Sequence, residues 1–186
     1  MKNEIRILGV DDAPFNKFKD KNVLIIGTIF RGGSWLDGIL STKVKVDGND
    51  STKKLIEMVN KCKFKPQIQC IILDGIAFGG FNIIDIDELN KKTKIPVIIV
   101  IRRMPDLKKI KTTLKKLGKE KKYKLIEKAG EVHKVGKIYI QLNGVTVENA
   151  KEIIRISCTR SLLPESIRVA HIIAAGIKLG ESKGKA

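Results

Sequence analysis

Short apolar runs that end at turn-forming residues recur along the first half of the chain. Residues 4–10 and 22–30 are such runs, and residues 39–46 alternate apolar and polar side chains with many β-branched residues. Runs of this length and composition are typical of β-strands. Two further apolar runs, at 68–73 and 95–101, predict strands that are buried on both faces of a sheet. The pattern therefore predicts five strands within this part of the chain.

Helical spacing of apolar residues appears between and after these strands. Asp50 or Ser51 is suited to cap the first helix, since both residue types favour the N-cap position. Residues 124–135 show neither the helical spacing nor the strand alternation of apolar residues, and we expect an irregular hairpin there. A strand is expected at 137–142. The predicted helices lie near residues 52–62, 82–92, 107–117, 146–158 and 164–179.

The order of these elements predicts an α/β fold with a mixed sheet. The first three strands are close enough in sequence to pair as a meander, and the later alternation of strands and helices favours parallel crossovers. Helices then cover both faces of the sheet. With 186 residues and no long linker, we expect a single domain over 1–186, with a polar tail at about 180–186.

The composition fits a soluble globular protein, with 42% hydrophobic and 31% charged residues. No apolar run reaches the roughly 18 residues that a membrane span requires. The N-terminus lacks the pattern of a signal peptide, so we expect a cytoplasmic protein. Its three cysteines match no zinc-binding spacing, and we expect them to be reduced.

A net charge of +17 favours a nucleic acid, DNA or RNA, as the partner. A lysine-biased genome or a thermophilic habit gives the same excess, so this alternative stays open. Trp35 is a candidate either for stacking on a base or for packing in the protein. Arg102 either reaches into the same cleft as Asp74 or forms an ordinary salt bridge. The lysines after residue 107 either contact phosphates or form a solvated helix face; those we select as candidates are Lys108, Lys115, Lys116, Lys121 and Lys122.

Three aspartates follow predicted strands. Asp11 ends the first strand, Asp47 the third and Asp74 the fourth. Sites in open α/β sheets form at the carboxyl ends of strands, and two close carboxylates repel unless a proton or a cation lies between them. Mg²⁺ or Mn²⁺ suits such oxygen ligands and supports phosphodiester hydrolysis. Aspartate is also common in turns, so a purely structural role remains the alternative.

Three longer segments carry a resemblance to a known family. They are "GVDDAPF" at 9–15, "ILDGIAFGGFNIIDIDELNKKTKIPVIIV" at 72–100, and "KIYIQLNGVTVENAKEIIRISCTRSLLPESIRVAHIIA" at 137–174. The chain resembles endonuclease V and the archaeal domain-of-unknown-function 99 family. The resemblance implies a ribonuclease H-like fold and an enzyme that cuts a phosphodiester near deaminated purines with Mg²⁺. It places metal-binding aspartates at Asp11 and Asp74, and gives Asp47 as a rough counterpart of a third, glutamate ligand.

The chain departs from endonuclease V at two places. The histidine that follows a late strand in that family is missing, with Asn143 nearest to its position, and the tyrosine–proline wedge is replaced by "GGSWLDG". His171 is interpreted as a core or partly buried histidine rather than a catalyst. Our leading hypothesis is therefore a nucleic-acid-binding, metal-dependent nuclease without preference for deaminated purines. The alternatives are a noncatalytic nucleic-acid-binding protein on the same fold and a protein–protein scaffold.

Overall fold

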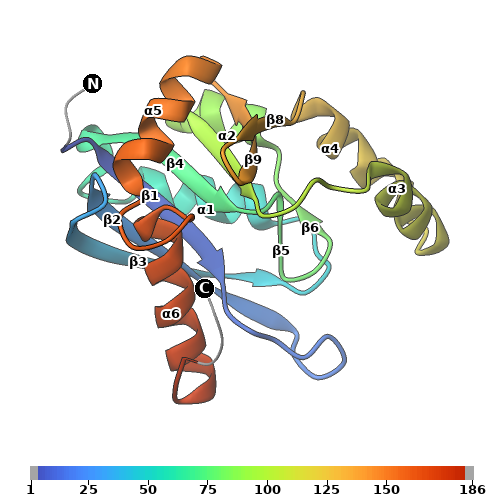
Figure 1. Cartoon of the computed structure of the whole chain (residues 1–186). Helices are drawn as coiled ribbons and strands as arrows, with labels where there is room; N and C mark the ends of the chain where they lie inside the picture. Colours follow the sequence, from blue (N-terminus) through green and yellow to red (C-terminus); the bar gives the residue numbers. More distant parts are fainter. Residues whose placement is uncertain (1–3, 183–186) are drawn as a thin grey trace.

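A seven-stranded mixed sheet forms the centre of the computed structural model, which describes residues 4–182 (Figure 1). The strands β1, β4 and β7 are parallel to one another, and all other neighbours in this sheet are antiparallel. A separate hairpin consists of β5 (Ala77–Phe78) and β6 (Asn82–Ile83). Across the large sheet, the strands are β3 (Trp35–Lys45), β2 (Asn22–Arg31), β1 (Arg6–Asp12), β4 (Ile68–Asp74), β7 (Val97–Ile101), β9 (Ile138–Asn143) and β8 (His133–Val135).

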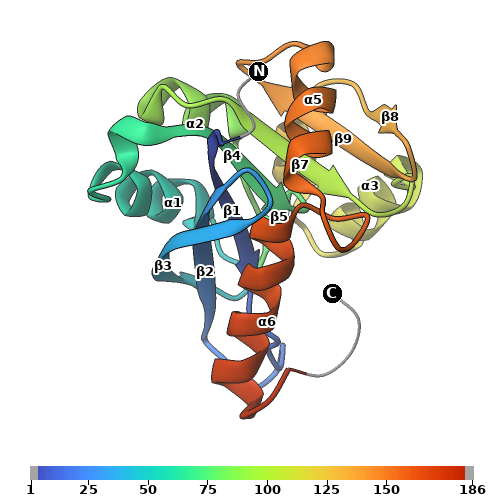
Figure 2. The same cartoon turned by 60° about the vertical axis from the view of Figure 1, so that its left-hand side comes forward.

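Helices cover both faces of this sheet (Figure 2). One face packs against α1 (Ser51–Asn60) and α2 (Ile86–Thr93), and the other against α5 (Val147–Ser157) and α6 (Glu165–Leu179). The helices α3 (Leu107–Lys116) and α4 (Tyr123–Lys128) extend to one side in Figure 1. Two short 3-10 helices, η1 (Lys65–Gln67) and η2 (Glu120–Lys122), complete the elements. Between residues 4 and 182, no helix is long and apolar enough to cross a bilayer.

Alternation along the central strands decides which side chains share a face. Leu8 and Val10 of β1 belong to the core under α1 and α2, whereas Ile7 belongs to the core under α5 and α6. In β4, Cys70 and Ile72 face the second core. Because successive side chains of a strand point to opposite faces, the end residues Asp11 and Asp74 continue the α5–α6 face.

The predicted mixed sheet, with its meander of β1, β2 and β3 and its helices on both faces, is confirmed. Three local predictions were wrong. The strand expected at 39–46 begins at Trp35, because the turn after β2 takes only residues 32–34. The helix expected near 82 begins at Ile86, where the side chain of Asp85 caps it by accepting the Glu88 N–H. The segment 124–135 contains most of α4 as well as β8. Of the polar tail, residues 183–186 lie outside the described part of the chain.

Candidate active site

The strands β1 and β4 end side by side and bring two aspartates to one edge of the sheet. Val10 pairs with Leu73 in parallel register, so Asp11 and Asp74 are the next residues on the two neighbouring strands. Both line a cavity of about 580 Å³. The expectation that parallel pairing brings these two aspartates together is confirmed. The other residues of this cavity are Asp12, Ala13, Pro14, Phe15, Arg102 and His171.

His171 on α6 contacts Asp11 directly. Its Nδ1 lies 2.8 Å from the Asp11 Oδ2, and its side chain is 29% exposed, whereas that of Asp11 is 6% exposed. An ionised carboxylate is an acceptor only, so Nδ1 donates to it, and Nε2 is then the acceptor nitrogen when the imidazole is neutral. This hydrogen bond raises the pKa of His171, while burial raises the pKa of Asp11, and the nearby Asp74 charge raises it further. The buried charge of Asp11 is therefore partly compensated by the imidazole.

Close packing of α6 on β1 fixes this contact. A Cβ atom added to Gly9 would lie 2.4 Å from the backbone carbon of Ser166, a distance that real Cβ atoms do not show. The hydroxyl of Thr28 on β2 also donates to the Ser166 carbonyl, at 2.6 Å. Glycine at position 9 thus lets the helix approach close enough for His171, further along α6, to reach Asp11.

Asp12 adds a third carboxylate from the other side of β1. Its Oδ2 accepts the backbone N–H of Gly79 at 2.7 Å, in the loop between β5 and β6. Burial raises the pKa of Asp12 to about 6, and repulsion from Asp11 contributes in the same direction. At neutral pH this cavity therefore concentrates negative charge in partly buried surroundings, which favours a bound cation.

Arg102 pairs with the second strand-end aspartate. Its Nη2 donates to Asp74 Oδ2 at 2.7 Å, and its side chain is 43% exposed at the rim of the cavity. Arg102 thus combines the two roles expected for it, a position in the same cleft as Asp74 and a salt bridge. A guanidinium at this rim is suited to bind a phosphate next to the carboxylates.

The structure places Asp47 apart from this cavity, which differs from the expected trio of carboxylates. Asp47 has a left-handed backbone (φ 52°), and its Oδ1 accepts the N–H of Phe81 at 2.8 Å. Its Oδ2 lies 3.2 Å from the Lys119 ammonium and 3.8 Å from that of Lys17. Although burial raises the pKa of Asp47, these contacts lower it overall. Both oxygens are thus engaged in joining the β3–α1 loop to neighbouring segments.

The donor set at the cavity suits a hard cation with open coordination positions. Within residues 4–182, no three His, Cys, Asp or Glu side chains form a ready-made metal-binding group. Mg²⁺ commonly takes only one or two carboxylates and completes its shell with water and substrate phosphate. Asp11 and Asp74 meet that requirement, since both line the same cavity and the repulsion between them would be relieved by a cation.

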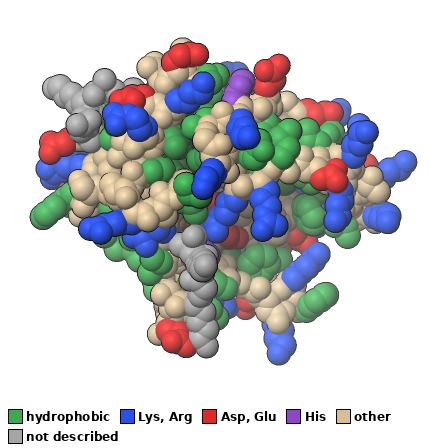
Figure 3. All heavy atoms as spheres, in the orientation of Figure 1, with side chains coloured by type: hydrophobic (Ala, Val, Ile, Leu, Met, Phe, Trp, Pro, Cys, Tyr) green, Lys and Arg blue, Asp and Glu red, His purple; other side chains and the backbone are tan. Residues whose placement is uncertain are grey.

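Among the predicted nucleic-acid contacts, Lys122 proves to have a different role. Its ammonium donates to three backbone carbonyls, those of Asp47, Gly48 and Phe81, at 2.6 to 3.0 Å. An ammonium has three N–H groups, so this side chain is fully engaged in joining η2 to the β3–α1 and β5–β6 loops. The remaining predicted lysines are exposed, and we call this group the lysine face: Lys108, Lys115, Lys116 and Lys121. Figure 3 shows basic side chains spread over the whole of this face of the molecule, including the end where α3 lies in Figure 1.

Trp35 lies far from the carboxylates. It starts β3 and pairs with Arg31, which in turn pairs with Arg6 at the beginning of β1, whereas Asp11 lies at the end of that strand. The indole is 64% exposed and so is not a core residue either. Neither role expected for Trp35 is found here: the indole does not pack in the core, and it lies away from the carboxylates beside which a stacked base was expected.

Comparison with known proteins adds to this geometry. A family model described as endonuclease dU matches residues 3–178. A UPF0215 protein of Methanothermobacter thermautotrophicus is 51% identical over 191 residues, which span 100% of this chain and 94% of the relative. The crystal structure of a protein of unknown function from Archaeoglobus fulgidus superposes with a TM-score of 0.86 at 40% identity, covering 92% of this chain and 97% of that one.

A more distant neighbour supports the fold class. Endonuclease V of Ciona intestinalis, in complex with a 24mer DNA containing an inosine followed by a ribo-adenosine, matches with a TM-score of 0.54 at 18% identity. The match covers 90% of this chain and 82% of that one. At this identity the likeness shows a shared ribonuclease H-like fold, as the sequence predicted.

Proposed function

Because the chain belongs to the endonuclease dU family, we propose that it is a metal-dependent endonuclease that cuts nucleic acid at the edge where β1 and β4 end. The observation that carries this proposal is the convergence of Asp11, Asp74 and His171, from three remote segments, on one open cavity. The family description, endonuclease dU, supports the substrate class that we propose, DNA that contains deoxyuridine. The DNA complex of the Ciona endonuclease V supports a nucleic acid as the partner on this fold.

In this proposal Asp11 and Asp74 bind Mg²⁺ or Mn²⁺. When bound, the cation supplies an activated water and neutralises charge on the phosphate. Arg102 binds a nonbridging oxygen of the same phosphate, since its guanidinium already lies at the rim beside Asp74. His171 keeps Asp11 in one orientation through Nδ1 and offers Nε2 for carrying a proton to the leaving oxygen. Asp12 holds the β5–β6 loop against the cavity through the Gly79 N–H.

The test is cleavage of labelled strands by the purified protein with Mn²⁺. Single-stranded DNA, duplex DNA and RNA are compared, each with and without one uracil base. We expect cutting of the deoxyuridine-containing DNA by the wild type, and loss of cutting in Asp11→Asn and Asp74→Asn. Asp87→Asn, a surface aspartate that pairs with Lys91 on α2, is the matched control and should cut normally.

The other outcomes separate the rival functions. Cleavage that persists in both site variants would contradict the proposed site. Salt-sensitive binding without cleavage by the wild type would favour the noncatalytic nucleic-acid-binding protein. Neither binding nor cleavage would favour the scaffold, with its charge set by composition.

A further inference from the structure

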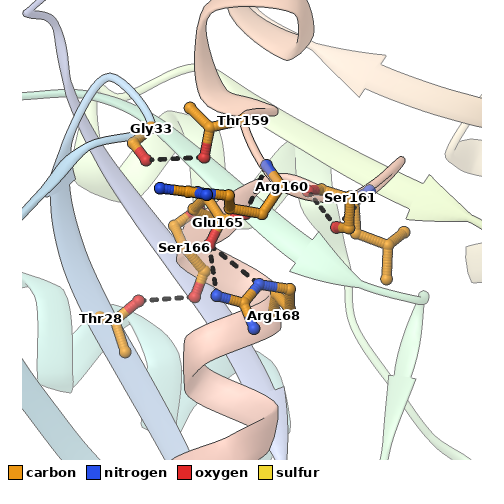
Figure 4. Close-up of polar contacts among 9 residues, drawn as sticks. Thr28, Gly33, Thr159, Arg160, Ser161, Glu165, Ser166 and Arg168 are labelled. Atoms are coloured by element: carbon orange, nitrogen blue, oxygen red, sulfur yellow. Dashed lines mark hydrogen bonds and ion pairs between the residues drawn. The ribbon is translucent and has the colours of Figure 1, made fainter. Parts of the chain in front are cut away.

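A second cavity, of about 610 Å³, lies at the opposite end of β1 from the candidate active site. It is enclosed by the turn between β2 and β3, the α5–α6 loop and the beginning of α6 (Figure 4). In β1 and β2, Arg6 pairs with Arg31 and Asp11 with Ile26, so five residues separate the two ends. At about 3.3 Å per residue, the two cavities are about 17 Å apart along the strand.

Arginines are concentrated around this second cavity. The chain contains 37 lysines and arginines, of which only seven are arginines. Four of the seven lie at this end, namely Arg6, Arg31, Arg160 and Arg168. Two carboxylates accompany them, Asp37 between the first pair and Glu165 beside Arg168, so four positive and two negative charges leave +2. Lysine-biased composition does not explain an arginine cluster, and the planar guanidinium is the side chain best suited to grip a phosphate.

Hydrogen bonds hold the cavity wall in a fixed shape. The buried carboxylate of Glu165 accepts from the Arg168 Nε and Nη2, at 2.9 and 2.6 Å, and from the Arg160 backbone N–H at 3.2 Å. Thr159 donates to the Gly33 carbonyl at 3.3 Å, which ties the α5–α6 loop to the β2–β3 turn. A Cβ on Gly33 would come within 2.7 Å of Thr159, so glycine permits this approach. Figure 4 shows the Arg160 side chain extending across Glu165.

The lining combines phosphate-binding groups with an apolar wall. The guanidinium groups of Arg160 and Arg168 and the hydroxyl of Ser34 are donors, and Phe30 and Leu36 provide apolar surface. Small-molecule sites have volumes of roughly 300 to 1,000 Å³, a range that includes this cavity. We infer that it binds one nucleotide unit of the substrate strand, with the phosphate at the arginines and the sugar and base on the apolar wall.

The inference that this cavity binds a nucleotide rests on the proposed function in one respect only, namely that the nucleotide belongs to the substrate strand. At about 3.4 Å per stacked nucleotide, a separation of about 17 Å corresponds to about five nucleotides between the two cavities. By binding this nucleotide, the second cavity positions the strand relative to the carboxylates.

The experiment measures the affinity for a fluorescent 12-nucleotide DNA, containing one deoxyuridine, in EDTA, so that no cleavage is needed. Arg160→Ala removes the exposed guanidinium without orphaning Glu165, which Arg168→Ala would do. We expect about tenfold weaker binding, equivalent to about 1.4 kcal/mol, and a salt dependence reduced by about one phosphate contact. Arg160→Lys keeps the charge but loses the planar fork, so it should recover only part of the affinity. The control is Arg155→Ala on α5, an exposed arginine paired with Glu152, which should bind like the wild type.

Equal binding by Arg160→Ala and Arg155→Ala would overturn the inference, even if the wild type cuts DNA with Mn²⁺. Arg160-dependent binding by a protein that does not cut would uphold the inference and refute the nuclease proposal. A competition arm with thymidine monophosphate separates the two sources of phosphate. If the mononucleotide binds in an Arg160-dependent manner while DNA affinity stays unchanged, the site takes a free nucleotide and the strand assignment is wrong.

Discussion

Replacing Asp12 by asparagine should stabilise the protein at neutral pH. Burial holds the carboxyl pKa at about 6, compared with 3.8 for an ordinary aspartate, so the folded protein binds this proton more tightly than the unfolded chain does. The contribution of Asp12 to the stability of the wild type is therefore lost as the pH rises from about 4 to above 6. Asparagine carries no charge at any of these pH values, and its amide oxygen can still accept the Gly79 N–H.

The difference between the two pKa values gives the size of the effect. They differ by about 2.2 pH units, and each unit corresponds to about 1.36 kcal/mol, so the full contribution is about 3 kcal/mol. The free energies of unfolding of wild type and Asp12→Asn should be nearly equal close to pH 4. They should diverge until the variant is more stable by about 3 kcal/mol near pH 8.

Urea unfolding at a series of pH values, in EDTA, measures this difference. The matched control is Asp87→Asn on α2, whose half-buried carboxylate pairs with Lys91 and Lys128. Its stability should not rise relative to the wild type as the pH increases, because its ion pairs lower the pKa of Asp87 instead. If the free energies of unfolding of wild type and Asp12→Asn run parallel from pH 4 to pH 8, the reasoning is refuted. That result would show that burial of the ionised Asp12 carboxylate does not destabilise the folded protein.

Three more predictions concern the other contacts. In an NMR titration, the pKa of His171 should fall in Asp11→Asn, because the hydrogen bond to the ionised carboxylate raises it; an unchanged value would mean that the pair does not form in solution. Lys122→Met should lower the free energy of unfolding in urea by about 2 kcal/mol, because three carbonyls lose a charged donor. The control, Lys121→Met, should change that free energy by less than about 0.5 kcal/mol. Neutralising the four residues of the lysine face together should lower the salt dependence of DNA binding by up to about four phosphate contacts, and an unchanged slope would show that this face is merely solvated.

The meeting of Asp11 and Asp74 was predicted from the sequence on one condition, that the first and fourth strands are parallel neighbours, and the family resemblance pointed to the same two aspartates. The structure meets this condition, since β1 and β4 pair in parallel, and the carboxyl ends of parallel strands meet at one edge of the sheet. Asp12 was not selected, because adjacent aspartates look alike in sequence and only the Gly79 contact distinguishes them. Asp47 also follows a strand, but lysines that are distant in sequence engage its carboxylate.

His171 was interpreted from the sequence as a core or partly buried histidine, and the structure shows it partly buried and in contact with Asp11. Its position four residues after Ile167 places it on the buried face of α6, a signal that fits a core histidine as well as a ligand. What decides between them is the docking of α6 over β1, which depends on the space left by Gly9. Likewise, periodicity cannot show which lysine of a basic segment meets three carbonyls, as Lys122 does, because that depends on tertiary contacts.

The Asp11–His171 contact joins residues that are 160 positions apart, and this has a consequence for biosynthesis. Chains are made from the N-terminus at about 5 to 20 residues per second, so Asp11 is synthesised at least about 8 seconds before His171. Until α6 is complete, β1 has no helix over Gly9 and the aspartate has no imidazole partner. A growing chain on the ribosome, surrounded by RNA, therefore carries an incomplete site until its synthesis is almost finished.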